Sequence, residues 1–192
     1  MQPAMEHALK TTWLILGLYW LWSSRRIKAT SHMESFLKRF AAYYFPLVAA
    51  GALLGPGEWY GDSWLHQRFL PELGLFEPVG IVLVIAGAFF ACWARYTLGR
   101  NWSVAAQLKN EHELIQSGPY RFVRHPIYSG LLLAFLGTTV MIGEWRALLA
   151  FAIILISFLY KFRVEERLLR MHFGDSYVQY ASRTKALVPG AY

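Results

Sequence analysis

The sequence is poor in the groups from which disulfides and metal sites are usually built. It contains a single cysteine, Cys92, which excludes an intramolecular disulfide and any metal site made of several cysteines. Its six histidines form no HxxH or HxxxH pair. Glu111 and Glu113 flank His112 but would point to other faces of a helix. We therefore expect no metal site.

Charged residues are also scarce. They make up 16% of the 192 residues, whereas hydrophobic residues make up 56%, and the mean hydropathy is +0.30. This balance is typical of a membrane protein and not of a soluble domain. A chain of this length holds one domain, here residues 1–192, so any chemistry must be built on the hydrophobic part itself.

Five apolar runs are candidates for membrane helices, which need about 20 residues. They cover residues 9–24, 40–55, 75–98, 127–143 and 145–162. The first two are shorter than ideal, and the third is the clearest. Little more than Glu144 separates the last two, and so short a connection forces an antiparallel helical hairpin. The sequence therefore predicts an all-α integral membrane protein with five transmembrane helices.

The basic residues give this protein an orientation. Of the 19 Lys and Arg residues, all but Lys10, Arg68 and Arg146 fall on one side of the predicted spans. The positive-inside rule then places the N-terminus outside and the C-terminus in the cytoplasm. Loops near anionic lipid explain the net charge of +7, so we expect no nucleic-acid partner.

The first of two cytoplasmic segments rich in polar groups covers residues 107–128. The stretch 118–120, Gly-Pro-Tyr, indicates a turn, and Pro126 opens the helix of the fourth span. The free amide groups at the start of that helix are candidates to meet a polar ligand group. The alternative is that Arg121 and Arg124 only anchor the chain at lipid phosphates.

The second segment covers residues 161–184, where Glu165 and Glu166 follow directly on the fifth span. Ionisable groups at that depth are costly unless they are paired or functional. The alternative is a solvated helical turn in which Glu166 and Arg170 form an i,i+4 pair. A shared site is favoured because the hairpin makes the cytoplasmic ends of spans four and five neighbours.

The motifs GPYRFVRHPIYSG and VEERLLRMHFGDSYVQY, followed by Leu187-Val188-Pro189, closely resemble the C-terminal signature of the isoprenylcysteine carboxyl methyltransferase family. These integral-membrane enzymes methylate prenylated C-terminal cysteines. The resemblance covers residues 107–189, so the catalytic part would be about 100–192. The five-span length resembles a prokaryotic member, which would lie in the cell membrane with its active site facing the cytoplasm. No ExGxGxG loop of soluble methyltransferases is present, which agrees with a separate, helical way of binding the cofactor.

The resemblance implies S-adenosyl-L-methionine as the cofactor. Its implied contacts are Gln107, His112, Glu113, Leu114, Ile115, Tyr120, His125, Pro126, Ile127, Tyr128 and Glu165. The implied catalytic groups are Arg163, Lys161 and Glu166. The substrate-side arginine of the family falls on Lys161, so either Lys161 or Arg163 would orient the substrate carboxylate. Glu166 would either face the cofactor or hold Arg163 in place.

The implied partners are a lipophilic prenylcysteine-type substrate and membrane lipid, with a lipid-facing opening that admits the prenyl chain sideways. Three alternatives remain. A phospholipid amine methyltransferase would need a base, for which Glu166 and His125 are candidates. A membrane isoprenoid or sterol-type reductase would use a nicotinamide cofactor. A non-catalytic membrane protein would pack its spans through small residues, as in the GxxxG of Gly51 and Gly55.

Overall fold

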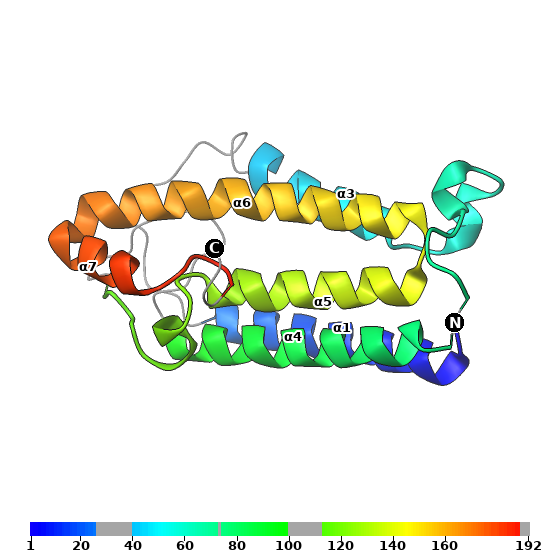
Figure 1. Ribbon diagram of the computed structural model, residues 1–192, viewed down its shortest axis with the longest axis horizontal. Coiled ribbons are helices and arrows are strands. Elements are labelled where there is room, and N and C mark those ends of the chain that lie inside the picture. The colour runs from blue at the N-terminus through cyan, green and yellow to red at the C-terminus, as the bar shows by residue number, and fades with distance from the viewer. Residues whose placement is uncertain (26–39, 73, 100–112, 189–192) are drawn as a thin grey trace.

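The computed structural model describes residues 1–25, 40–72, 74–99 and 113–188, which are helical without any β-strand (Figure 1). The main helices are α1 (Pro3–Ser24), α3 (Phe45–Leu53), α4 (Phe76–Leu98), α5 (Pro126–Ile142), α6 (Trp145–Phe173) and α7 (Asp175–Arg183). Short helical turns are η1 (Phe40–Tyr44), which continues into α3, η2 (Gly57–Tyr60), η3 (Trp64–His66) and η5 (Gly118–Arg121). Each of the five predicted spans coincides with helix, so the all-α prediction is confirmed.

Within the described ranges, α4 and α6 are the two helices that are long and apolar enough to cross a membrane. The helical stretch Phe40–Leu53 and α5 are apolar but shorter. Length and composition therefore support a helical membrane protein. The number of five spans and the orientation stay predictions.

The helices form two packed pairs, α1 with α4 and α3 with α6, and α5 lies between the pairs (Figure 1). Helix α1 packs along α4, α3 packs along α6, and α5 packs closely against α4. The expected hairpin of spans four and five is confirmed, because α5 ends at Gly143 in the left-handed conformation, with φ 67°, and Glu144 precedes α6. The start of α5 and the end of α6 consequently lie at the same end of the molecule.

Helix α6 is longer than the predicted fifth span of residues 145–162. It continues without a break to Phe173 and stops at Gly174, whose φ of 52° does not suit other residues. The prediction ended the element where its apolar run ends, but no helix-breaking residue stands there. Glu165 and Glu166 therefore belong to the same rigid helix that lines the apolar interior.

Four glycines bring α4 and α5 into backbone contact. Gly80 faces Gly137, and Gly87 faces Gly130; a Cβ on Gly87 would lie 2.5 Å from the carbonyl oxygen of Gly130. Small residues allow such close approach between apolar helices, where packing replaces hydrophobic driving force. The GxxxG of Gly51 and Gly55 plays no such part, since a Cβ on Gly51 meets none of the described residues within 4 Å.

A buried arginine joins the loop after α3, which includes residues 54–72, to the hairpin of α5 and α6. Arg146 is 5% exposed, contacts Glu144 at 2.5 Å, and donates hydrogen bonds to the carbonyls of Leu53 at 2.9 Å and Gly55 at 2.5 Å. His66 of the loop lies 3.0 Å from the same carboxylate of Glu144. This loop is thus tied to α3 and α6.

We expect Gly87→Ala to lower the unfolding temperature in detergent, because its methyl group would press on the backbone of α5. Overpacking of this kind costs about 1–3 kcal/mol. Gly51→Ala is the matched control, since the same change meets open space and adds helix propensity of up to about 1 kcal/mol. Equal unfolding temperatures for both variants would contradict the role of the glycines.

Candidate active site

The C-terminal segment holds the start of α5 in place. The backbone amides of Arg124 and His125 donate to the carbonyls of Lys185 at 2.8 Å and Ala186 at 3.0 Å. The hydroxyl of Ser129 donates to the carbonyl of Leu187 at 2.6 Å. Pro126 begins α5, where its missing amide proton costs nothing. The two segments that carry the polar motifs are therefore bonded to each other.

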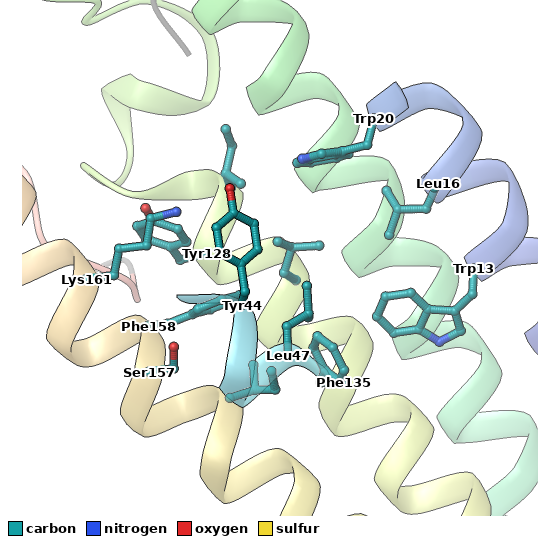
Figure 2. A pocket seen from close by; sticks show the side chains of 14 residues that line it. Trp13, Leu16, Trp20, Tyr44, Leu47, Tyr128, Phe135, Ser157, Phe158 and Lys161 are labelled. Carbon is teal, nitrogen blue, oxygen red and sulfur yellow. The ribbon is translucent and has the colours of Figure 1, made fainter. Parts of the chain in front are cut away.

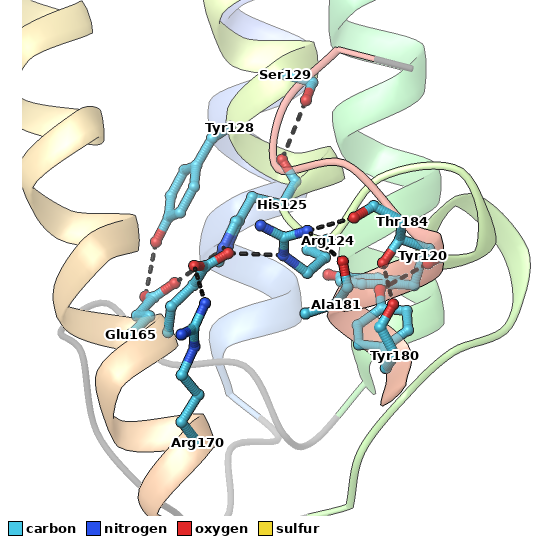
Figure 3. A network of polar contacts seen from close by, with 11 residues as sticks. Tyr120, Arg124, His125, Tyr128, Ser129, Glu165, Arg170, Tyr180, Ala181 and Thr184 are labelled. Carbon is cyan, nitrogen blue, oxygen red and sulfur yellow. Dashed lines mark hydrogen bonds and ion pairs between the residues drawn. The ribbon is translucent and has the colours of Figure 1, made fainter. Parts of the chain in front are cut away.

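The paired acids of α6 meet side chains from the start of α5 (Figure 3). The hydroxyl of Tyr128 donates to Glu165 Oε1 at 2.7 Å, and His125 Nδ1 lies 3.7 Å from Glu165 Oε2. The other ring nitrogen of His125 lies 3.3 Å from Glu166 Oε1. His125 also stacks on Tyr128 with 5.6 Å between ring centroids. The predicted convergence of the two motifs is therefore present in the structure.

Arg124 connects this cluster to α7, as Figure 3 shows. Its Nε donates to Glu166 Oε1 at 2.7 Å, and its guanidinium also donates to the carbonyls of Ala181, at 3.3 Å, and Thr184. Both charged side chains are largely buried, at 12% and 13% exposed. Arg124 directly precedes the HPIY motif, which could have indicated a role in the site. The sequence analysis instead gave it only as an anchor at lipid phosphates.

Glu166 has three basic side chains around its carboxylate. Its carboxylate contacts Arg124, His125 and, at 3.7 Å, Arg170. The i,i+4 pair with Arg170 is therefore confirmed, whereas Arg163 is exposed and the idea that Glu166 holds it stays a prediction. Burial acts to raise the pKa of Glu166, but hydrogen bonds from His125 and Arg124 outweigh it and lower the pKa to about 2.

Helix α7 supports the cluster from outside. The hydroxyl of Tyr180 donates to the carbonyl of Tyr120 at 2.6 Å, and Thr184 donates to the carbonyl of Tyr180 at 2.7 Å. Burial raises the pKa of Tyr120 and raises that of Tyr180 to about 12, so both hydroxyls stay neutral. Tyr177 is fully buried, and its hydroxyl has no hydrogen-bond partner among the described residues.

The other predicted cofactor contacts are only partly placed. Tyr120, Ile127 and Tyr128 share one hydrophobic cluster, and Ile115 packs against it. Glu113 is exposed and Leu114 is half-buried at the same end of the molecule. Pro126 is buried at the start of α5. The remaining two, Gln107 and His112, lie outside the described residues.

An apolar cavity of about 330 Å³ opens beside the cluster (Figure 2). Helices α1, α3, α5 and α6 and the turn η1 supply its walls. Tyr128 and Lys161 line one end of the cavity, and Trp13 and Phe135 line the other. Tyr128 also belongs to the polar cluster through Glu165. The cavity and the cluster are therefore parts of one site.

Lys161 occupies the boundary between these parts. Its Nζ lies 5.1 Å from the centre of the Tyr128 ring, in a cation–π contact. Arg163, two residues further, is exposed and is not among the cavity-lining residues. Of the two candidate cations, only Lys161 is thus placed where a ligand in the cavity would meet it.

Comparison with known proteins agrees with this arrangement of apolar helices and paired acids. The family model described as phospholipid methyltransferase matches residues 76–176, more than half of the chain. The chain therefore matches a methyltransferase family, and its apolar helices agree with a membrane protein. No group of three or more possible metal ligands is found among the described residues.

Curated relatives define the family more closely. A probable protein-S-isoprenylcysteine O-methyltransferase of Oryza sativa subsp. indica is 36% identical over 123 residues, which are 62% of this chain and 64% of the relative. Protein-S-isoprenylcysteine O-methyltransferase B of Arabidopsis thaliana is 34% identical over 57% of each chain. The Saccharomyces cerevisiae protein-S-isoprenylcysteine O-methyltransferase is 31% identical over 82% of this chain and 68% of its own.

The chain belongs to the isoprenylcysteine carboxyl methyltransferase family. It spans less than two thirds of the length of the two plant relatives.

We expect the stability of the cluster to fall as the pH drops from about 4.5 to about 2. The pKa of Glu166 is lower in the folded protein than its ordinary 4.5, so its stabilising effect is complete above that pH and is lost through the folded pKa of about 2. The effect is roughly 3 kcal/mol. Unfolding temperatures measured against pH should therefore depend on pH less in Glu166→Gln than in the parent.

The control for this measurement is Glu72→Gln, which changes an acid with 82% of its side chain exposed. It should leave the pH dependence of the parent intact. An unchanged pH dependence in Glu166→Gln would contradict the assignment of Glu166 to a buried ion pair.

Proposed function

We propose that the protein transfers a methyl group from S-adenosyl-L-methionine to the carboxylate of a prenylcysteine-type substrate, forming a methyl ester at the boundary between membrane and cytoplasm. One observation carries this proposal: the apolar cavity ends at Lys161 and Tyr128, beside the paired acids. Such a site suits a molecule with an apolar chain and an anionic end. The names of the curated relatives support the same substrate class.

The residues present fit the cofactor. Glu166 is already paired with Arg124, whereas Glu165 accepts a hydrogen bond from the neutral Tyr128 and is more exposed, at 22% against 13%. Glu165 is therefore the better placed of the two acids to contact a cationic group. S-adenosyl-L-methionine supplies a positively charged amino group and a sulfonium-bound, electrophilic methyl group. Glu165, His125 and Tyr128, with Ile115 and Tyr120 beside them, would hold it.

Lys161 would orient the substrate carboxylate by a charge-assisted hydrogen bond. A carboxylate is already ionised at neutral pH, so the chain need not supply a general base. Its task is to place the carboxylate oxygen in line with the methyl group and to exclude water. The rings of Trp20 and Phe158 line the cavity and serve that exclusion.

Arg124 and Glu166 act as positioning residues in this proposal. They contact each other and His125 and lie away from the apolar cavity. Glu166, initially a candidate catalytic group, would thus fix His125 and the start of α5. Arg163 has no direct part in the reaction.

Phospholipid amine methylation is the second candidate, because the matching family model bears that description. A protonated amine would be repelled by Lys161, and it would need a base. His125 and Glu166, the candidates for that base, are both engaged in the buried cluster. The carboxylate is therefore the better acceptor for this site.

The membrane setting belongs to the same proposal. Five spans with the site facing the cytoplasm agree with the helix positions and with the basic residues around the polar cluster. The relatives compared above come from plants and yeast, so the predicted prokaryotic cell membrane gains no support from them and stays a prediction.

The first experiment gives detergent-purified protein methyl-labelled S-adenosyl-L-methionine and S-geranyl- or S-farnesylcysteine analogues. We expect label in a base-labile ester that releases methanol, and at least tenfold less ester from an analogue without a prenyl chain. Label transferred only to phospholipid amines would favour the second candidate. Equal methylation with and without the chain would contradict the role of the cavity.

Variants of α6 separate the roles of its charges. Lys161→Ala should retain binding of labelled cofactor but lose at least 100-fold in kcat, because it removes the group that orients the carboxylate. Glu165→Gln should weaken cofactor binding itself. Arg163→Ala should keep most of the activity, and Arg167→Ala, an exposed cation on the same helix, is the control. A larger loss in Arg163→Ala than in Lys161→Ala would reverse the assignment.

A further inference from the structure

Two aromatic rings in contact line the end of the apolar cavity that lies away from Lys161. Trp13 of α1 and Phe135 of α5 lie 4.8 Å apart between ring centroids, inclined at 51°. The indole Nε1 of Trp13 donates a hydrogen bond to Thr138 Oγ1 at 3.1 Å, and Thr138 donates to the carbonyl of Ala134 at 2.9 Å. The indole is thus fixed by packing and by a polar contact, so it forms a firm end to the cavity.

Helix geometry gives the depth of the cavity. Tyr128 and Phe135 on α5 are seven positions apart, as are Lys161 and Ile154 on α6, and all four side chains line the cavity. At the helical rise of 1.5 Å per residue, each stretch is about 10 Å long. An extended polypeptide advances about 3.5 Å for three backbone bonds, so a chain of carbon bonds advances about 1.2 Å per bond. A chain of about eight bonds therefore reaches from Lys161 to Trp13.

This length corresponds to a geranyl group on sulfur and is too short for an extended farnesyl group, which has one more isoprene unit. We propose that Trp13 is a specificity-determining residue that limits the apolar chain held in the cavity to about the length of a geranyl group. A longer chain must leave through the side of the cavity or displace the indole. This inference rests on the proposed function only in taking a prenylcysteine as the ligand.

The side of the cavity offers a second test. Gly17 lies between Trp13 and Trp20 on α1 and lines the cavity, and a Cβ there meets none of the described residues within 4 Å. A larger side chain at this position would fill the middle of the cavity without removing any contact. Gly17→Leu should therefore shorten the accepted chain, whereas Trp13→Ala should lengthen it.

The test measures equilibrium binding of S-geranyl- and S-farnesylcysteine to the purified protein, with ester formation recorded separately. The parent should bind the geranyl compound at least as tightly as the farnesyl compound. In Trp13→Ala the ratio of farnesyl to geranyl affinity should rise at least tenfold, because one more isoprene unit becomes buried. In Gly17→Leu the geranyl affinity should fall at least tenfold, while an S-dimethylallyl compound should still bind.

Trp22→Ala is the matched control, because it removes an indole from the same helix that is 56% exposed and does not line the cavity. Binding of labelled cofactor reports whether each variant is folded. An unchanged chain-length ratio in Trp13→Ala together with unchanged geranyl binding in Gly17→Leu would overturn the inference, as would failure of the parent to bind either compound. Shifted ratios without ester formation would support the inference and contradict the proposed reaction.

Discussion

The ion pair between Arg124 and Glu166 is the constraint on which the active-site end of the molecule depends. A buried carboxylate is costly unless a cation and hydrogen bonds compensate it. Here the same guanidinium also binds carbonyls near the end of α7, so one side chain joins α5, α6 and α7. His125 contacts the same carboxylate oxygen, Glu166 Oε1. The orientation of the histidine thus follows from the ion pair, and the position of Glu165 follows from the helix they share.

Glu165 and Glu166 show how adjacent acids acquire different properties. Glu166 points toward Arg124 and forms an ion pair with it, whereas Glu165 points toward the hydroxyl of Tyr128. Neighbouring helical residues face different directions, so one acid can stabilise the fold while the other stays accessible to a cation. Lys161 lies one turn before them on the side of the apolar cavity. A single stretch of α6 thereby presents a cation, an anion and an apolar wall in fixed order.

The sequence predicted the helices and the meeting of the two motifs, because apolar runs and a short hairpin leave little freedom. It did not predict the length of α6, since hydropathy ends at the membrane boundary while helix propensity does not. It also missed Arg124, whose partner carboxylate is 42 residues away. The sequence could not show that Lys161, and not Arg163, lines the cavity, because the direction of each side chain depends on the helical phase. The contact of Gly87 and Gly130 needed the register of α4 against α5, which no local pattern supplies.

Each of the two helix pairs is held together by its own hydrogen bond. Helix α1 is bonded to α4 through Arg95, which donates to the carbonyl of Ser23 at 2.7 Å, whereas η1 is bonded to α6 through Ser157, which donates to the carbonyl of Ala42 at 2.9 Å. The walls of the apolar cavity therefore include helices of two units, α1 with α4 and α3 with α6, each with its own internal hydrogen bond. Neither bond crosses from one unit to the other, so a separation of α1 from α3 would leave both bonds intact. If the substrate carries an apolar chain dissolved in the bilayer, as proposed, such an opening would let the membrane itself act as the reservoir from which the site is filled.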